Sequence, residues 1–208
     1  MQAIASVLVF VGLALPAHAG SQRQEPLADA VRTALSAAVS EDDVHRAALH
    51  RADLVGPRDV WVQRMQPLLE RRLRRAAVGQ WRQEWASPGL QRELLETVWY
   101  EATRSGLEPE LVLGLIEVES DFRKFAVSSA GALGLMQVMP FWMRDLAQDD
   151  ARRLFHLRTN LRFGCVILRH YLDREAGDLF MALGRYNGSR GRAAYPQAVL
   201  AAQARWKI

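Results

Sequence analysis

The stretch from Glu108 to Pro140 reads EPELVLGLIEVESDFRKFAVSSAGALGLMQVMP and decides the fold prediction. A proline directly after Glu108 favours a helix start, and Leu111 and Leu115 lie four residues apart on the face that Glu119 shares. Positions 128–139 are rich in glycine and other small residues, a composition typical of a loop. We therefore expect a helix that ends at Glu119 and leads into a glycine-rich loop.

Helix-start and helix-stop residues divide the chain beyond this stretch as well. Ser87-Pro88 is a helix-capping pair and Gly106 is a helix stop, so a helix is expected between them. β-branched residues nowhere alternate with polar ones over more than a few positions, so strands are not expected. Further helices are expected after Pro140, over 160–175, from Asp178, and after Pro196. The prediction is an all-α domain over residues 88–208.

Residues 20–87 form a helical extension in front of this domain. Gly56-Pro57 is expected to break the chain there, and a helix from about Asp59 is expected to be kinked or divided by Pro67. We expect these helices to pack on the domain, to lengthen its binding cleft or to dock on a partner complex, and the pattern does not choose among these.

The first twenty residues contain no Asp, Glu, Lys or Arg, and all 27 basic and 23 acidic residues lie downstream. An apolar run from about Ala3 to Leu15 ends in Ala17-His18-Ala19, a pattern typical of a signal peptide cleaved after Ala19. An N-terminal membrane anchor is the alternative, but the run is shorter than the ~20 residues that span a bilayer. We expect residues 1–19 to be removed and the mature protein to be periplasmic or secreted.

Several common functional classes find no support in the sequence. The only cysteine, Cys165, lies in an apolar helical stretch and is expected to be a buried, inert thiol. The five histidines lack zinc-site spacing, and no nucleotide-binding glycine motif is present, so no metal or cofactor is expected. The arginine cluster over residues 71–75 is expected to be a solvated helix face, and no nucleic-acid partner is expected.

Glu119 is the candidate catalytic residue because it lies on the apolar face of its helix, near the helix C-terminus. Burial and the negative end of the helix dipole both disfavour a carboxylate there, so both raise the pKa. A carboxyl group that stays protonated near neutral pH can donate a proton to a glycosidic oxygen. Taken alone, the pattern favours a helix-end carboxylate turned to solvent, and only the residues that follow favour a catalytic role. Glu117 points to another face.

The residues after Glu119 carry a family resemblance. Glu119-Ser120, Ser128 and the run GALGLMQVMP over 131–140 match, without a gap, the pattern E-S-x-[FW]-x-P-x-A-x-S-x-x-G-A-x-G-L-M-Q-x-M-P. This segment resembles the catalytic segment of the soluble lytic murein transglycosylases, whose SLT domain has a lysozyme-like, goose-type helical fold. Lys124 replaces the proline of the pattern and puts the rigidity of the turn in doubt.

Later motifs follow in the order of that family. The segment ALGRYNG over 182–188 is similar to the family's A-L-A-A-Y-N-x-G motif, and Tyr195 resembles its late tyrosine. The helix from Asn160 to Leu172 is similar to the N-I-x-x-G-x-x-Y-L helix between these motifs. The resemblance covers about residues 88–200 and does not extend to 20–87.

The resemblance implies a peptidoglycan lyase with one catalytic carboxyl group. Glu119 would act first as acid on the bond between N-acetylmuramic acid and N-acetylglucosamine and then as base, so that a 1,6-anhydro ring closes and no water is consumed. Glycan strands of peptidoglycan would be the substrate. The family positions around the sugar are, in this chain, Ser120, Ser128, Met136, Gln137, Tyr186, Asn187 and Tyr195.

Other readings of the same residues remain open. A lysozyme-like hydrolase would need a second carboxylate, for which Asp121 and Asp145 are candidates, although loop exposure is expected for Asp121. A catalytically silent peptidoglycan-binding module is a further alternative, against which the retention of Glu119 argues. For Met136, core filling and substrate contact fit the pattern equally well. Residues 20–87 are a candidate docking segment for a cell-wall or secretion complex.

Overall fold

The computed structural model of the chain describes residues 31–33, 35–36, 52–75, 81–144 and 150–207. Over these ranges the regular elements are helices, and the only β-type pairings are isolated bridges within the loop before α7. The elements in chain order are α3 (Ala52–Arg75), α4 (Trp81–Glu84), α5 (Pro88–Arg104), α6 (Pro109–Glu119), α7 (Phe141–Arg144), the 3-10 helix η1 (Ala151–Phe155), α8 (Leu157–Arg174), α9 (Leu179–Asn187) and α10 (Ala194–Trp206). The all-α prediction is confirmed.

Capping residues set the starts of α5 and α9 as the sequence predicts. The Ser87 hydroxyl accepts a hydrogen bond of 3.2 Å from the Leu90 amide, and the Asp178 carboxylate accepts one of 3.0 Å from the Met181 amide. These side chains satisfy amides that have no partner inside the helix. Gly188 ends α9 with a left-handed backbone, φ 79°, a conformation in which glycine carries no Cβ penalty.

Two predictions for residues 52–75 are wrong, because α3 continues through Gly56-Pro57 and is not divided at Pro67. A kink at Pro67 stays a prediction. A proline removes one backbone hydrogen bond from a helix and favours a kink or an end. In α3 that loss is outweighed by a continuous buried face, to which Met65 and Leu69 contribute. Tertiary burial therefore overrides the local signal.

Two later helices begin earlier than predicted. α8 starts at Leu157, three residues before Asn160, and follows directly on η1. α10 starts at Ala194, so Pro196 occupies its first turn, where a missing amide proton costs no helical hydrogen bond.

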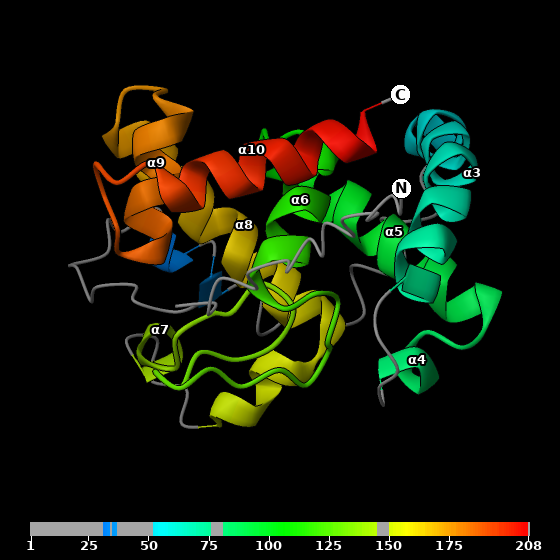
Figure 1. Ribbon diagram of the computed structural model, residues 1–208, viewed down its shortest axis with the longest axis horizontal. Coiled ribbons are helices and arrows are strands. Elements are labelled where there is room, and N and C mark those ends of the chain that lie inside the picture. Colours follow the sequence, from blue (N-terminus) through cyan, green and yellow to red (C-terminus); the bar gives the residue numbers. More distant parts are fainter. Residues whose placement is uncertain (1–30, 34, 37–51, 76–80, 145–149, 208) are drawn as a thin grey trace, which may run out of the picture.

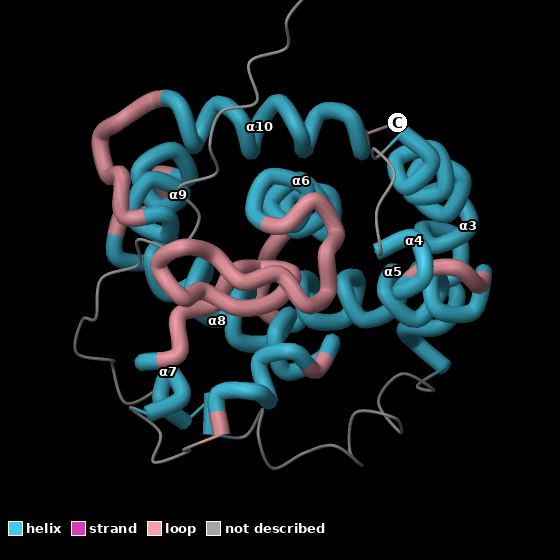
Figure 2. The backbone as a smooth tube through the Cα atoms, turned by 60° about the horizontal axis from the view of Figure 1, so that its bottom comes forward, coloured by secondary structure: helices cyan, strands magenta, loops and turns pink. Residues whose placement is uncertain are grey.

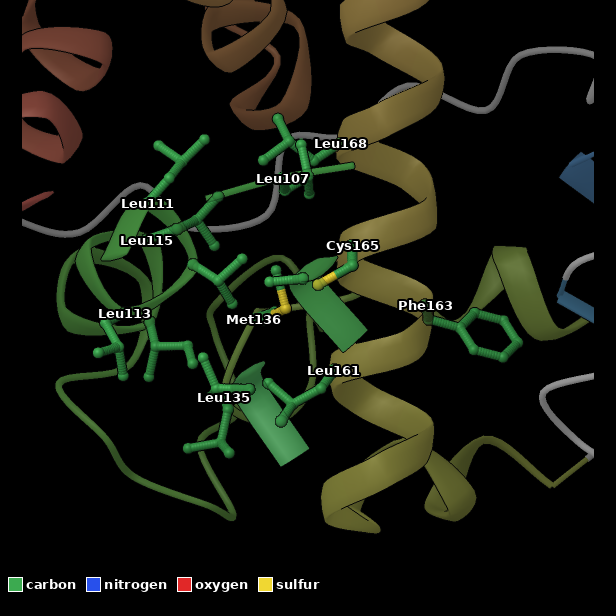
Figure 3. Close-up of a cluster of buried hydrophobic side chains, with 14 of the residues drawn as sticks. Leu107, Leu111, Leu113, Leu115, Leu135, Met136, Leu161, Phe163, Cys165 and Leu168 are labelled. Carbon is green, nitrogen blue, oxygen red and sulfur yellow. The ribbon is translucent and has the colours of Figure 1, made fainter. Parts of the chain in front are cut away.

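The α6 helix lies at the centre of the molecule, and α10 crosses over it (Figure 1). Gly114 allows this close approach, because a Cβ at that position would lie 2.6 Å from the Gln203 backbone nitrogen. Beneath α6, leucines of this helix meet Met136 of the loop and Cys165 of α8 in one buried cluster (Figure 3). Cys165 is fully buried, as expected, and burial raises its pKa well above the usual value.

Residues 120–140 form the long loop between α6 and α7, drawn pink across α6 and α8 in Figure 2. Leu133 pairs with both Val127 and Val138 in isolated antiparallel bridges. These backbone pairings fold the loop back on itself, so that its central residues are buried although they belong to no helix.

None of the described helices is both long enough and apolar enough to span a bilayer. The expected signal peptide over residues 1–19 lies outside the described residues.

Candidate active site

Glu119 is the last residue of α6 and is only 4% exposed. The apolar spacing of Leu115 and Ile116 turns it toward the core, as the sequence predicts. Glu117, two positions earlier, points toward α3 and α10 instead, where it forms ion pairs with Arg72 and Arg205. The two carboxylates of one helix end therefore have different surroundings.

The Glu119 carboxyl group has one hydrogen-bonded oxygen and one free oxygen. The Tyr195 hydroxyl, at the start of α10, donates a hydrogen bond of 2.5 Å to Oε1. Oε2 is buried and has no hydrogen-bond partner among the described residues. Buried polar atoms normally find a partner, so Oε2 is the carboxyl oxygen that is left without one among the described residues.

Burial raises the pKa of Glu119 from 4.5 to about 8, and the hydrogen bond from Tyr195 lowers it in part. The Tyr195 pKa is raised well above its usual value, first by burial and then by Glu119 and Tyr186 nearby. At neutral pH Glu119 is therefore a protonated acid beside a neutral phenol, the state that a proton donor needs.

Met136, Gln137 and Tyr186 form a second group, which shapes the loop. The Tyr186 hydroxyl donates a hydrogen bond of 2.7 Å to the Met136 carbonyl. The Gln137 amide donates bonds of 2.9 and 3.3 Å to the carbonyls of Gly134 and Ala126, and its own backbone has a left-handed φ of 50°. Met136 is fully buried, which favours the core-filling interpretation of this residue.

The two predicted serines make local contacts. The Ser120 hydroxyl is buried and donates to the Ile116 carbonyl at 3.2 Å, so it closes the end of α6. The Ser128 hydroxyl accepts a bond of 3.0 Å from the Ala132 amide and closes a turn in the loop. Asn187 is buried at the end of α9.

Asn160 is a site-shaping residue that the sequence interpretation did not single out. Its side-chain oxygen accepts from the Met136 amide at 2.8 Å, and its amide group donates to the carbonyls of Leu133 and Leu154 at 2.9 and 2.8 Å. One side chain at the start of α8 thus holds the loop on both sides of Gly134. The asparagine that opens the 160–172 motif was the available signal.

Asp121 differs from the expected exposed loop carboxylate. It is half-buried, has a left-handed φ of 53°, and forms an ion pair with Arg72 of α3. Asp145, the other candidate second carboxylate, lies outside the described residues.

The arginine cluster over residues 71–75 is a solvated face with one exception. Arg71, Arg74 and Arg75 are exposed, as predicted, but Arg72 turns inward to Glu117 and Asp121. Over the described residues, no group of three or more His, Cys, Asp or Glu side chains is placed to hold a metal ion.

The sequence of this chain was compared with models of known protein families. The family described as the Transglycosylase SLT domain matches residues 96–208, more than half of the chain. The chain belongs to the SLT domain family. The match contains Glu119, the loop and Tyr195, whereas Arg72, Glu84 and Trp85 precede it.

Relatives of this SLT domain are named transglycosylases. Membrane-bound lytic murein transglycosylase C of Actinobacillus pleuropneumoniae is 55% identical over 115 residues, which cover 48% of this chain and 32% of the relative. The transglycosylase of Enterobacteria phage PRD1 is 35% identical over 98 residues, which cover 47% of this chain and 36% of the phage protein. The chain thus spans about a third of the length of these relatives.

A solved structure shares the fold. An inactive mutant of the lytic transglycosylase Slt from Pseudomonas aeruginosa superposes with a TM-score of 0.51 and 19% identity, over 89% of this chain and 38% of that one. The likeness shows that the SLT domain of this chain has the helical, lysozyme-like fold of Slt.

Proposed function

We propose that this chain is a lytic transglycosylase that cleaves peptidoglycan between N-acetylmuramic acid and N-acetylglucosamine and closes a 1,6-anhydro ring on the muramoyl residue. The observation that carries the proposal is the state of Glu119. It is a buried carboxyl group with a pKa of about 8, with one oxygen bonded to Tyr195 and the other unpartnered among the described residues. Membership of the SLT domain family and the names of the relatives support the same reaction.

In the first step Glu119 donates its proton to the glycosidic oxygen. The bond from that oxygen to C1 of the muramoyl residue breaks, and positive charge develops at C1. Oε2 is the oxygen available for this transfer because Tyr195 occupies Oε1. The Tyr195 hydrogen bond stabilises the carboxylate that the transfer creates.

In the second step the Glu119 carboxylate takes the proton of the muramoyl C6 hydroxyl. The hydroxyl oxygen attacks C1 and forms the anhydro ring, and Glu119 returns to its protonated state. Two half-reactions therefore use one carboxyl group, and water is neither consumed nor required.

The described carboxylates next to Glu119 in sequence are held in ion pairs with arginines. Glu117 is paired with Arg72 and Arg205, and Asp121 is paired with Arg72. A hydrolase that uses two carboxyl groups is the competing function, and its product differs from the proposed one by one water.

The remaining residues that the resemblance assigns to the site are proposed to orient Glu119, to stabilise helix ends or to shape the loop. Tyr195 orients Glu119, and Ser120 and Asn187 are buried at the ends of α6 and α9. Ser128, Met136, Gln137 and Tyr186 shape the loop that faces the sugar. The hydrogen bonds of Gln137 and Tyr186 within the loop support a shaping role.

The domain division and location are proposed as the sequence indicates. Residues 1–19 would be removed after Ala19, 20–87 would form the extension, and 88–208 would be the catalytic domain. The site of action would be the periplasm or the exterior of the cell, where peptidoglycan lies.

The test is to digest purified peptidoglycan with the chain, beside Glu119→Gln, and to measure the masses of the soluble products. Products that end in 1,6-anhydro-muramic acid with wild type, and not with Glu119→Gln, are expected. Products heavier by one water with reducing ends would show a hydrolase instead. Absence of soluble products from both proteins would favour a binding module.

A further inference from the structure

The turn that follows Glu119 has a backbone that ordinary residues avoid. Asp121 and Phe122 both have left-handed φ angles, 53° and 64°, and neither is glycine. Such conformations persist only where the surroundings hold them. Because this turn begins two residues after Glu119, whatever holds the turn also bears on the position of the carboxyl group.

Arg72 of α3 contacts one residue before Glu119 in the sequence and one residue after it. Its Nε lies 3.0 Å from Glu117 Oε1 in an ion pair that lacks hydrogen-bond geometry, and a terminal nitrogen of the same guanidinium donates a hydrogen bond to Asp121. The planar guanidinium offers several donors in one fork. One side chain thus ties the last turn of α6 to the first left-handed residue after it.

Trp85 holds the second left-handed residue. Its indole nitrogen donates a hydrogen bond of 2.7 Å to the Phe122 carbonyl, and Trp85 is 3% exposed. The Phe122 ring is fully buried and packs edge-on against Trp206 of α10, with ring centres 5.7 Å apart. The backbone and side chain of Phe122 are therefore held from two directions.

Glu84 holds the end of the turn through the position that departs from the family pattern. The Lys124 amide donates a hydrogen bond of 2.7 Å to Glu84 Oε2. The pattern that this segment resembles has proline at position 124, and proline has no amide proton to donate. In this chain the hydrogen bond to Glu84 restrains the backbone at Lys124, where proline would restrain it through its fixed φ angle.

We propose that Arg72, Glu84 and Trp85 are positioning residues for Glu119. They hold the turn over residues 121–124 and thereby orient the Glu119 carboxyl against Tyr195. All of them precede residues 96–208, the part that matches the SLT domain family. The segment before the family domain thus helps to position the Glu119 carboxyl group. This inference rests on the proposed function.

The sharpest test measures the effect of Glu84→Ala on kcat in two backgrounds, wild type, which has the Lys124 amide proton, and Lys124→Pro, which lacks it. In the wild-type background we expect kcat to fall about tenfold with KM unchanged, since small displacements of reacting groups have large effects on rate. In a Lys124→Pro background the donor is absent, so Glu84→Ala should change kcat by less than about twofold. Equal losses of kcat in both backgrounds would overturn the proposal.

A matched control separates positioning from general stability. Glu70→Ala removes the same group from α3, where Glu70 pairs with Arg74 on the surface, and it should leave kcat unchanged. Arg72→Met should lower kcat as Glu84→Ala does, and Arg72→Lys should recover part of the loss. If Glu84→Ala and Arg72→Met lower only the melting temperature, the contacts are structural and the proposal fails.

A second readout needs no enzymatic activity. The pKa of Glu119 can be measured from the pH dependence of unfolding, with Glu119→Gln as reference. Because the Tyr195 hydrogen bond lowers this pKa, Glu84→Ala should raise it if the carboxyl shifts away from Tyr195. An unchanged pKa would contradict the positioning role, whereas missing products from wild type would contradict the proposed function alone.

Discussion

The Tyr195 hydroxyl donates a hydrogen bond of 2.5 Å to Glu119 Oε1 across 76 residues of sequence. The bond joins the first turn of α10 to the last residue of α6. Because burial raises the Glu119 pKa and this bond lowers it in part, the contact lowers the upper pH limit at which Glu119 remains a proton donor.

Tyr195→Phe is expected to move the alkaline limit of activity to higher pH. Activity requires protonated Glu119, so kcat/KM of wild type should fall as pH rises through about 8. Removal of the hydroxyl removes the contact that lowers the pKa, so the fall should occur at higher pH. We also expect kcat at pH 7 to fall about tenfold, because the carboxyl loses its orientation. The measurement is a pH profile of anhydro-product release.

The control for this profile is Tyr100→Phe on α5, since Tyr195 is the hydrogen-bond partner of Glu119 in the described structure. Its alkaline limit should match wild type. An unchanged limit in Tyr195→Phe would mean that the phenol does not bond Glu119 in solution.

Glu119→Gln is expected to stabilise the protein at alkaline pH. The folded pKa of about 8 lies above the ordinary 4.5, so between these values the folded state binds more protons than the unfolded state. Stability therefore falls as pH rises from 4.5 to 8 and then levels off. Each pKa unit corresponds to about 1.4 kcal/mol, so the loss over 3.5 units amounts to ~5 kcal/mol.

Urea unfolding of wild type and Glu119→Gln at pH 4.5 and pH 9 would measure this difference. The variant should be more stable by several kcal/mol at pH 9 and nearly equal to wild type at pH 4.5. A difference that does not depend on pH would show that Glu119 titrates normally.

Asn160→Ala is expected to destabilise the loop more than an ordinary surface substitution. It removes three hydrogen bonds to Met136, Leu133 and Leu154. The Leu133 carbonyl keeps its bond of 3.0 Å from the Val138 amide, whereas the Met136 amide and the Leu154 carbonyl lose the partner that Asn160 supplies. Buried unsatisfied groups cost about 1–3 kcal/mol each, so the free energy of unfolding should fall by roughly 3 kcal/mol. A fall below ~0.5 kcal/mol in urea unfolding would show that water replaces these bonds.

Gly114→Ala is expected to push α6 and α10 apart. The new Cβ would lie 2.6 Å from the Gln203 nitrogen and 3.1 Å from the Val199 carbonyl oxygen. Overpacking of this kind costs about 1–3 kcal/mol, and separation of the helices should weaken the bond from Tyr195 and raise the Glu119 pKa. Both the melting temperature and the pH profile measure the outcome.

Gly56→Ala is the matched control, because a Cβ at Gly56 of α3 meets no atom within 4 Å. Alanine favours helix over glycine by about 0.8–1.0 kcal/mol, so this variant should be slightly more stable. Equal destabilisation by both substitutions would rule out the close helix contact as the cause.

Local patterns were sufficient for much of this structure. The spacing of Leu115 and Ile116 places Glu119 on the apolar face of its helix, and the motif that follows it predicts a catalytic carboxyl group there. Ser87 and Asp178 mark helix starts. Each of these features depends on residues within one or two helical turns, whose geometry is known once the helix is assigned.

Predictions that depended on distant packing were less complete. The continuity of α3 through Pro67 depends on burial against other helices, and the Ser120 hydroxyl turns back to Ile116. Arg72 is indistinguishable in sequence from its exposed neighbours, yet it alone turns toward Asp121. A helix pattern predicts which residues share a face, but the neighbour that covers the face is set by the packing of the whole chain.

Periodicity, capping and an ungapped motif were enough to predict the helical class, the family and the catalytic carboxyl group at Glu119. The groups that surround this carboxyl follow from how distant helices pack together. Tyr195 reaches Glu119 because α10 crosses α6 at Gly114, and Glu84 reaches the Lys124 amide because a segment far earlier in the chain packs beside the turn. Contacts between residues so far apart arise from the joint packing of several helices, which no local pattern encodes.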